Sequence, residues 1–309
     1  MLDPIVALAG LLVGFVVGLT GMGGGALMTP ILVLIFKIEP LAAVSSDIVA
    51  AMIMKPVGGA VHWHRGTVHR QLVLWLMMGS IPAAFLGVIV LRSFGPEKSI
   101  QSVVKIALGV ALLVVAVGLI ARPFLQRKRR PELPVPLKVA RFRTLLIGVI
   151  GGLVVGITSV GSGSLIIIML LILYPRMRLS ELVGTDLVQA IPLVASAALA
   201  HLIFGEFHFA LTASILIGSI PGVFIGARFS ARAPDYVIRP ALVVVLTASA
   251  LKLLGVDTML VGAIAALMAL LALTCAVTAA QRANRMAAAT AAAAQAAEVS
   301  EAVLSNGGG

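Results

Sequence analysis

Cysteine and charged residues are scarce in this chain of 309 residues. The single cysteine, Cys275, excludes an internal disulfide and any metal site built from several cysteines. Charged residues make up 11% of the chain and hydrophobic residues 60%, and the mean hydropathy is +1.13. This composition leaves no room for a soluble domain and predicts an all-α, polytopic membrane protein. The apolar runs are too long and continuous for the short alternating strands of a β-barrel.

Motifs for nucleotide hydrolysis and metal binding are also missing. The chain has no G-x-x-x-x-G-K-[ST] and no H-E-x-x-H or Cys/His ligand spacing, so we expect no ATP hydrolysis, no metal and no cofactor. Lys and Arg number 23 against 12 Asp and Glu, an excess that would suggest nucleic acid in a soluble protein. In a membrane protein we expect cytoplasmic loops beside anionic lipid instead. The N-terminus lacks a basic segment, so the first apolar run is expected to be a retained anchor.

The apolar runs divide the chain into two membrane halves, 1–121 and 144–256. The runs cover residues 4–36, 41–63, 72–91, 100–120, 145–174, 182–204, 209–229, 237–254 and 259–280. The linker 122–143 between the halves is rich in proline and arginine, so the positive-inside rule places it in the cytoplasm. Residues 257–280 predict an extra C-terminal transmembrane helix, and 281–309 an alanine-rich tail that frays into disorder. The total is about eight to nine transmembrane helices.

The two halves repeat one another in sequence. A shift of 138 relates the glycines and threonine of the two opening runs, and a shift of 139 relates later positions. The matched pairs include Gly14 and Gly152, Gly18 and Gly156, Thr20 and Thr158, Gly25 and Gly163, Asp47 and Asp186, His62 and His201, and Gly79-Ser80-Ile81-Pro82 with Gly218-Ser219-Ile220-Pro221. Internal repeats with a site at their interface are typical of secondary transporters. Four crossings in each half would make the repeats parallel, whereas a first run that dips in and returns would make them inverted.

The first run, residues 4–36, is far longer than the roughly 20 residues that cross a bilayer as one helix, so we expect a break in it. A glycine cluster marks that break, and a Ser/Gly/Thr stretch marks its counterpart in the second half. Backbone N–H groups at a restarting helix favour an oxyanion, so both stretches are candidate substrate-binding sites. The candidates are Gly21, Gly23, Gly24, Gly25, Thr158, Ser159, Gly161, Ser162, Gly163 and Ser164. The alternative is close helix packing through small residues, which suits Gly10, Gly14 and Gly18 better.

Lys55 lies well inside the second apolar run and is followed by Pro56. A lysine at a helix centre costs about 2.5–3.5 kcal/mol on insertion scales, which favours a functional interpretation. Lys55 could be the counter-charge of a bound anion. It could instead snorkel or pair with Asp47 or Asp186. The shifted position in the second half is Val194, so a lysine-based site would be asymmetric.

Asp47 and Asp186 are the paired acids of the two repeats. Each could carry a proton, or more simply cap the helix that follows it. His62 and His201 lie near the ends of their runs and could relay protons, although histidines at membrane interfaces are common.

These motifs resemble the TauE/SafE family of bacterial sulfite exporters. The resemblance rests on the glycine pattern that opens each repeat, the Ser46-Asp47 and Thr185-Asp186 pairs and the two G-S-I-P segments, and it covers about residues 8–255. It implies a multi-pass permease of the bacterial inner membrane whose cargo is sulfite, an organosulfonate or a related anion. The motifs are typical of the family but do not select one cargo.

The sequence thus predicts a secondary transporter, an exporter by resemblance, that moves a small oxyanion across the lipid bilayer, coupled to an ion gradient and not an enzyme. An anion channel is one alternative. An intramembrane hydrolase with Ser162 or Ser164 as nucleophile and His201 as base is another. It is weakened because the first repeat has Gly24 and Ala26 at the serine positions.

Overall fold

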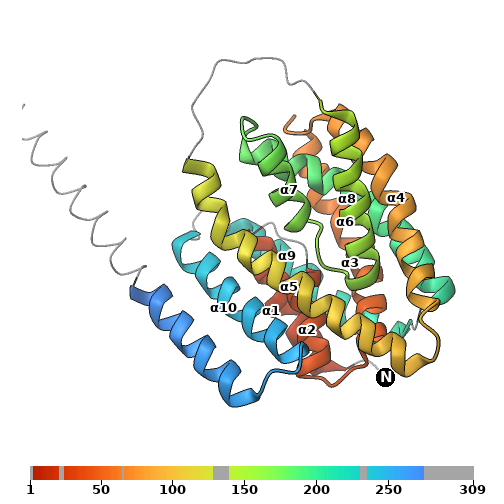
Figure 1. Cartoon of the computed structure of the whole chain (residues 1–309), viewed down its shortest axis with the longest axis vertical. Coiled ribbons are helices and arrows are strands. Elements are labelled where there is room, and N and C mark those ends of the chain that lie inside the picture. The colour runs from red at the N-terminus through yellow and green to blue at the C-terminus, as the bar shows by residue number, and fades with distance from the viewer. Residues whose placement is uncertain are drawn as a thin grey trace, which may run out of the picture.

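The computed structural model describes residues 3–20, 24–64, 66–127, 139–205, 207–229 and 235–274. Within these ranges the helices are joined by turns and loops, and the β-structure is an isolated bridge between Gly161 and Gly163 (Figure 1). The helices are α1 (Pro4–Thr20), α2 (Gly25–Leu34), α3 (Pro40–His64), α4 (Arg70–Arg92), α5 (Glu97–Arg127), α6 (Arg141–Thr158), α7 (Leu165–Leu173), α8 (Leu179–Phe204), α9 (Phe209–Phe229), α10 (Asp235–Leu253) and Thr258–Thr274.

Five of these helices contain segments long and apolar enough to cross a membrane. They are Arg70–Arg92, Glu97–Arg122, Arg141–Thr158, Ser180–Phe204 and Phe209–Gly226, and shorter apolar helices cover Pro4–Thr20, Gly25–Leu34 and Thr258–Thr274. The prediction of an all-α polytopic membrane protein is confirmed. The described part of α5 runs on through Pro123 to Arg127, so this helix ends later than the proline-rich composition of the linker suggests.

Both opening runs are interrupted inside the predicted glycine-rich stretches. The first run divides between α1 and α2, and its counterpart divides between α6 and α7. In the second break, residues 159–164, Ser159 has a φ of 62°, Gly161 of 136° and Gly163 of 87°. Glycine reaches these left-handed angles at little steric cost, and this explains why a glycine-rich sequence ends a helix here.

Two pairs of helices pack backbone to backbone, α1 with α9 and α4 with α6. A Cβ at Gly14 would come within 2.8 Å of the Ser219 Cα, and one at Gly152 within 2.7 Å of the Ser80 Cα. The packing interpretation of Gly10 and Gly14 is therefore confirmed, because a Cβ at Gly10 would also meet the α9 backbone.

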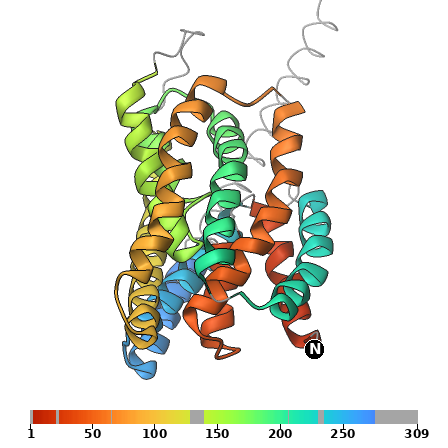
Figure 2. The same cartoon turned by 90° about the vertical axis from the view of Figure 1, so that its right-hand side faces the viewer.

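The helices α3 and α8 run antiparallel through the middle of the bundle. Ser45 near the start of α3 contacts His201 near the end of α8, whereas Gly59 lies against Ile191. The loop after α3 meets the start of α8, where the His69 N–H donates to the Thr185 hydroxyl at 3.0 Å. Figure 2 shows the start of α1 and the start of α6 at opposite ends of the bundle.

Candidate functional site

Three charged side chains are buried together where α3 and α8 pass the second break. Asp47 and Lys55 on α3 are 3% and 9% exposed, and Asp186 on α8 is 0% exposed. Burying a charge is costly unless it is paired and hydrogen-bonded, so this group needs partners close by. Those partners come from the second break.

Lys55 reaches from α3 into the second break. Its Nζ donates a hydrogen bond to the Ser162 Oγ, and Ser162 is itself 4% exposed. The ammonium group also interacts electrostatically with the carboxylates of Asp186 and Asp47. Lys55 does not snorkel to the surface; it is buried and hydrogen-bonded to the second break.

Asp47 is held by two hydroxyl groups. Its Oδ2 accepts from the Thr29 Oγ1 of α2 at 2.9 Å and from the Ser159 Oγ of the second break at 2.7 Å. The carboxylate therefore joins α2 of the first half to the break of the second half. Thr29 is fully buried, so the contact is shielded from water.

Asp186 is held by two N–H groups. Its Oδ2 accepts from the backbone N–H of Gly163 at 2.5 Å, and its Oδ1 accepts from the Gln189 Nε2 at 2.8 Å. The Gln189 Oε1 in turn accepts from the Ser80 hydroxyl of α4 at 3.2 Å. Since that hydroxyl donates to the amide oxygen, the amide nitrogen is directed toward Asp186.

The second break is thus the centre of the site, and the first break meets it at one point. A Cβ at Gly25, the first residue of α2, would come within 2.7 Å of the Ser159 Oγ and would also strike the Ser159 backbone. Gly24 is the N-cap residue of α2, and a Cβ there would meet the Val17 Cγ2 at 3.9 Å, an ordinary van der Waals contact. Gly21 and Gly23 lie outside the described residues.

The remaining candidate residues at the second break differ in whether their hydrogen-bonding groups are already used within the protein. The Thr158 hydroxyl donates to the Val154 carbonyl at 2.6 Å and accepts from the Val160 N–H at 3.2 Å, so it stabilises the helix end. Ser164 is the N-cap residue of α7 and makes no capping hydrogen bond with its side chain. The Gly163 N–H, expected to face an anion, is bonded to Asp186 in this conformation.

The capping interpretation of the two acids is wrong. Asp47 lies in the middle of α3, which begins at Pro40, and Asp186 lies inside α8, whose N-cap residue is Arg178. Neither carboxylate can reach the first turn of its own helix. Asp186 instead accepts a backbone N–H from the second break, and this contact ties α8 to the break.

His201 joins three helices. Its Nε2 donates to the Gly156 carbonyl oxygen at 2.7 Å, and its Nδ1 lies 2.8 Å from the Ser45 Oγ. Because a carbonyl only accepts, Nε2 carries the proton and Nδ1 of the neutral ring accepts from Ser45. Both ring nitrogens are thus hydrogen-bonded to groups other than Ser162, so the Ser162–His201 pair expected of a hydrolase is not formed. His62 lies near the end of α3, and its Nδ1 is 3.0 Å from the Thr67 hydroxyl.

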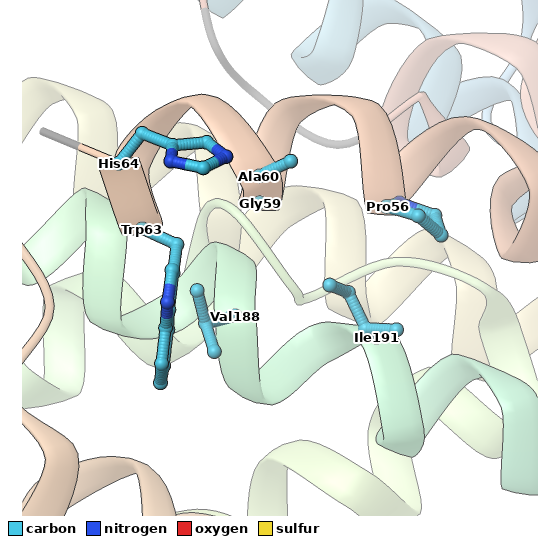
Figure 3. Close-up of a pocket in the computed structure, with 7 residues that line it drawn as sticks. All are labelled: Pro56, Gly59, Ala60, Trp63, His64, Val188 and Ile191. Carbon is cyan, nitrogen blue, oxygen red and sulfur yellow. The ribbon is translucent and has the colours of Figure 1, made fainter.

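A surface groove lies beside the site but differs from it in chemistry. Figure 3 shows this cavity of about 280 Å³ between α3 and α8. Its lining residues are Pro56, Gly59, Ala60, Trp63, His64, Val188 and Ile191. The lining is largely apolar and does not include Lys55, so the groove offers an anion little of the charge found in the buried site.

Sequence reasoning missed four polar residues that support the site: Thr29, Ser45, Ser80 and Gln189. Gln189 had a signal, because it lies three residues after Asp186 and so on the same helix face. The others act across helices that are distant in sequence.

Comparison with known proteins gives a consistent result. The family model described as "Sulfite exporter TauE/SafE" matches residues 6–253. The chain is 42% identical over 252 residues to the "Probable membrane transporter protein YjnA" of Bacillus subtilis (strain 168), covering 81% of this chain and 98% of that protein. It is 24% identical over 240 residues to the "Probable membrane transporter protein YdhB" of the same organism, covering 77% and 94% of the two chains. No solved structure matches the chain.

Proposed function

The chain belongs to the sulfite exporter TauE/SafE family, a family of membrane transporters, and from this we propose that it is a secondary transporter for a small oxyanion such as sulfite or an organosulfonate. We place it in the inner membrane of a bacterium, as the Bacillus relatives suggest. The description of the family supports export as the net direction.

The observation that carries the proposal is the contact of Lys55 with the second break. A buried ammonium group beside backbone N–H groups and serine hydroxyls is a set of donors suited to an oxyanion. We propose that the anion binds against Lys55, Ser162 and Ser164, and that Gly161 and Gly163 let the backbone approach it closely. Lys55 donates to the Ser162 hydroxyl, and this direction is opposite to the one that the base of a serine hydrolase needs.

The charges of the site favour coupling to protons. Asp47 and Asp186 outweigh Lys55, so the site is negative by one charge when all three groups are ionised. An anion entering such a site is repelled, and uptake of a proton by one carboxylate removes the excess. We therefore propose that the anion and a proton bind together. A dianion carried with one proton still has a net negative charge, so an inside-negative membrane potential favours its export.

The helix directions support inverted repeats. Asp47 and Asp186 are matched by the sequence repeat, and the helices that carry them, α3 and α8, run antiparallel. Related segments with opposite directions in the membrane are the basis of alternating access in many transporters. The side chains of Asp47, Lys55 and Ser162 are at most 9% exposed, which favours alternating access over an open channel.

Uptake of labelled anions into proteoliposomes tests the proposal. Sulfite, sulfoacetate and thiosulfate are compared with a carboxylate control, with and without a proton gradient. We expect saturable uptake of a sulfur oxyanion by the wild type. For Lys55→Ala we expect at least a tenfold loss of affinity, because a hydrogen bond to a charged group contributes about 1.5–3 kcal/mol.

Lys98→Ala is the matched control, since Lys98 is exposed in the first turn of α5. This variant should transport like the wild type. Failure of the folded wild type to move any of the anions would refute the oxyanion assignment. Equal uptake by Lys55→Ala and the wild type would show that the anion binds elsewhere.

A further inference from the structure

The two buried acids differ in the kind of donor that holds them. Asp186 accepts from the Gly163 backbone N–H and the Gln189 amide, and N–H groups of this kind can only donate. Asp47 accepts from the hydroxyls of Thr29 and Ser159, which can rotate and accept instead. The difference decides which carboxylate can gain a proton without losing its hydrogen bonds.

Protonation of Asp186 would disrupt its surroundings. Each of its two oxygens already receives an N–H, and the Ser80 hydroxyl directs the Gln189 amide toward it. A proton on either oxygen would weaken that oxygen as an acceptor for its N–H, and the new O–H would need an acceptor that neither N–H partner can supply.

Protonation of Asp47 leaves its contacts intact. Its two hydroxyl partners share the single oxygen Oδ2. If Oδ2 gains a proton, its O–H can donate to the Ser159 oxygen or the Thr29 oxygen, and that hydroxyl turns its own hydrogen elsewhere. The carboxyl group therefore has a hydrogen-bonded arrangement in both protonation states.

We propose that Asp47 is the site of the coupling proton and that Asp186 is a permanently ionised counter-charge for Lys55. This inference rests on the proposed transport of an oxyanion and assigns the proton to one of the two acids. The proton binds to the Asp47 carboxylate when the anion enters beside Lys55, and it leaves with the anion on the other side of the membrane. No covalent step is involved.

The charged surroundings of Asp47 are simple. Lys55, on the same helix, is the charged group that acts on it among the described residues, and Asp186 of α8 also acts on Lys55. The hydroxyls of Thr29 and Ser159 face it from α2 and from the second break. On α9, the uncharged Thr212 bonds weakly to the Ser46 carbonyl at 3.4 Å.

Because Ser159 also contacts Gly25, proton binding at Asp47 acts where the two breaks meet. A turn of the Ser159 hydroxyl would alter the contact between α2 and the second break. The assignment therefore places the coupling group at the point where the two halves touch.

The test compares Asp47→Asn with Asp186→Asn in proteoliposomes whose membrane potential is clamped, using labelled sulfite. For the wild type we expect the accumulation ratio to rise about tenfold for each unit of pH difference, as one proton per anion requires. Asp47→Asn resembles the protonated acid and should keep exchange of internal for external sulfite but lose the response to the pH difference. Asp186→Asn should lose exchange as well, because Lys55 is left without its counter-charge.

Asp47→Glu is the second variant and should regain a response to the pH difference, which distinguishes a lost proton site from a damaged fold. A pH response in Asp47→Asn equal to that of the wild type would overturn the assignment. Sulfite exchange without a pH response in Asp186→Asn would also overturn the assignment, since Asp186 would then be the proton site. Lack of sulfite transport by the wild type would instead refute the proposed function on which the inference rests.

Discussion

At the scale of single residues, the site is a set of rare polar groups whose partners come from other helices. Lys55 and the two acids stand out in the sequence because charge inside an apolar run is costly. The sequence could also predict that the second break is rich in hydroxyls. It could not predict that Lys55 contacts Ser162, since the two are 107 positions apart and no local pattern links them.

Gln189 and Ser80 provide a prediction at this scale. Replacing Gln189 with Met keeps the length of the side chain but removes the donor to Asp186. We expect at least a tenfold weaker apparent affinity for the anion, because a freed Asp186 competes for the Lys55 ammonium. Ser80→Ala should act in the same direction but more weakly, since it removes only the hydroxyl that orients the amide.

The double variant separates this relay from independent effects. If Ser80 acts through Gln189, then Ser80→Ala should have no further effect on uptake in the Gln189→Met background. Additive losses in the concentration dependence of uptake would contradict the relay.

At the scale of helices, the length of the apolar runs and the glycine clusters predicted where the two opening runs divide. The physical reason is strong, because a run well beyond one bilayer thickness must turn, and glycine is the residue that permits it. The contact between the breaks was not predictable, because it depends on how α2 and α6 pack. Helix capping by Asp47 and Asp186 was predicted wrongly, because their helices begin about two turns earlier than the local pattern suggests.

The contact between Gly25 and Ser159 gives the prediction for this scale. Gly25→Ala would place a Cβ against the Ser159 backbone and hydroxyl, so α2 or the second break must move. We expect uptake to fall by about tenfold or more while the protein still elutes as a single species in detergent. Overpacking of this kind costs about 1–3 kcal/mol.

Gly24→Ala is the neighbouring control. Its Cβ would make an ordinary van der Waals contact with Val17, and Gly24 has a φ of −59°, which any residue can adopt. This variant should transport like the wild type. If both alanines reduced uptake equally, the effect would come from the flexibility of the glycines and not from the contact with Ser159.

At the scale of the whole molecule, the packing of the helices favours the inverted repeats proposed above over parallel ones. A parallel arrangement would place Arg70 on one side of the membrane and Arg176, Arg178 and Arg228 on the other. In the structure all four arginines lie at one end of the bundle. The contact between His69 and Thr185 brings the start of α4 to the start of α8. Thr212 lies near Ser46 and Ser219 near Met54, so α9 runs parallel to α3 and its Arg228 reaches the same end.

This end of the bundle is therefore the more basic one among the described residues. It has Arg70, Arg141, Arg143, Arg176, Arg178 and Arg228 with the acidic Glu181, whereas the opposite end has Lys37, Arg92, Lys98 and Lys252 together with Asp3, Glu39, Glu97 and Asp257. By the positive-inside rule we expect the basic end to face the cytoplasm. The start of α1, at the opposite end in Figure 2, is then expected to face the outside of the membrane.

Labelling of single cysteines in intact cells checks this orientation. Cys275 is first replaced by serine, and Ser99→Cys or Ser180→Cys is then introduced, because both serines are exposed and lie at the starts of α5 and α8. A membrane-impermeant maleimide should label the Ser99→Cys variant from outside and the Ser180→Cys variant only after the membrane is opened. The reverse pattern would invert the orientation. The antiparallel course of α3 and α8 requires the two helix starts to lie on opposite sides of the membrane, so labelling of both from outside would contradict it.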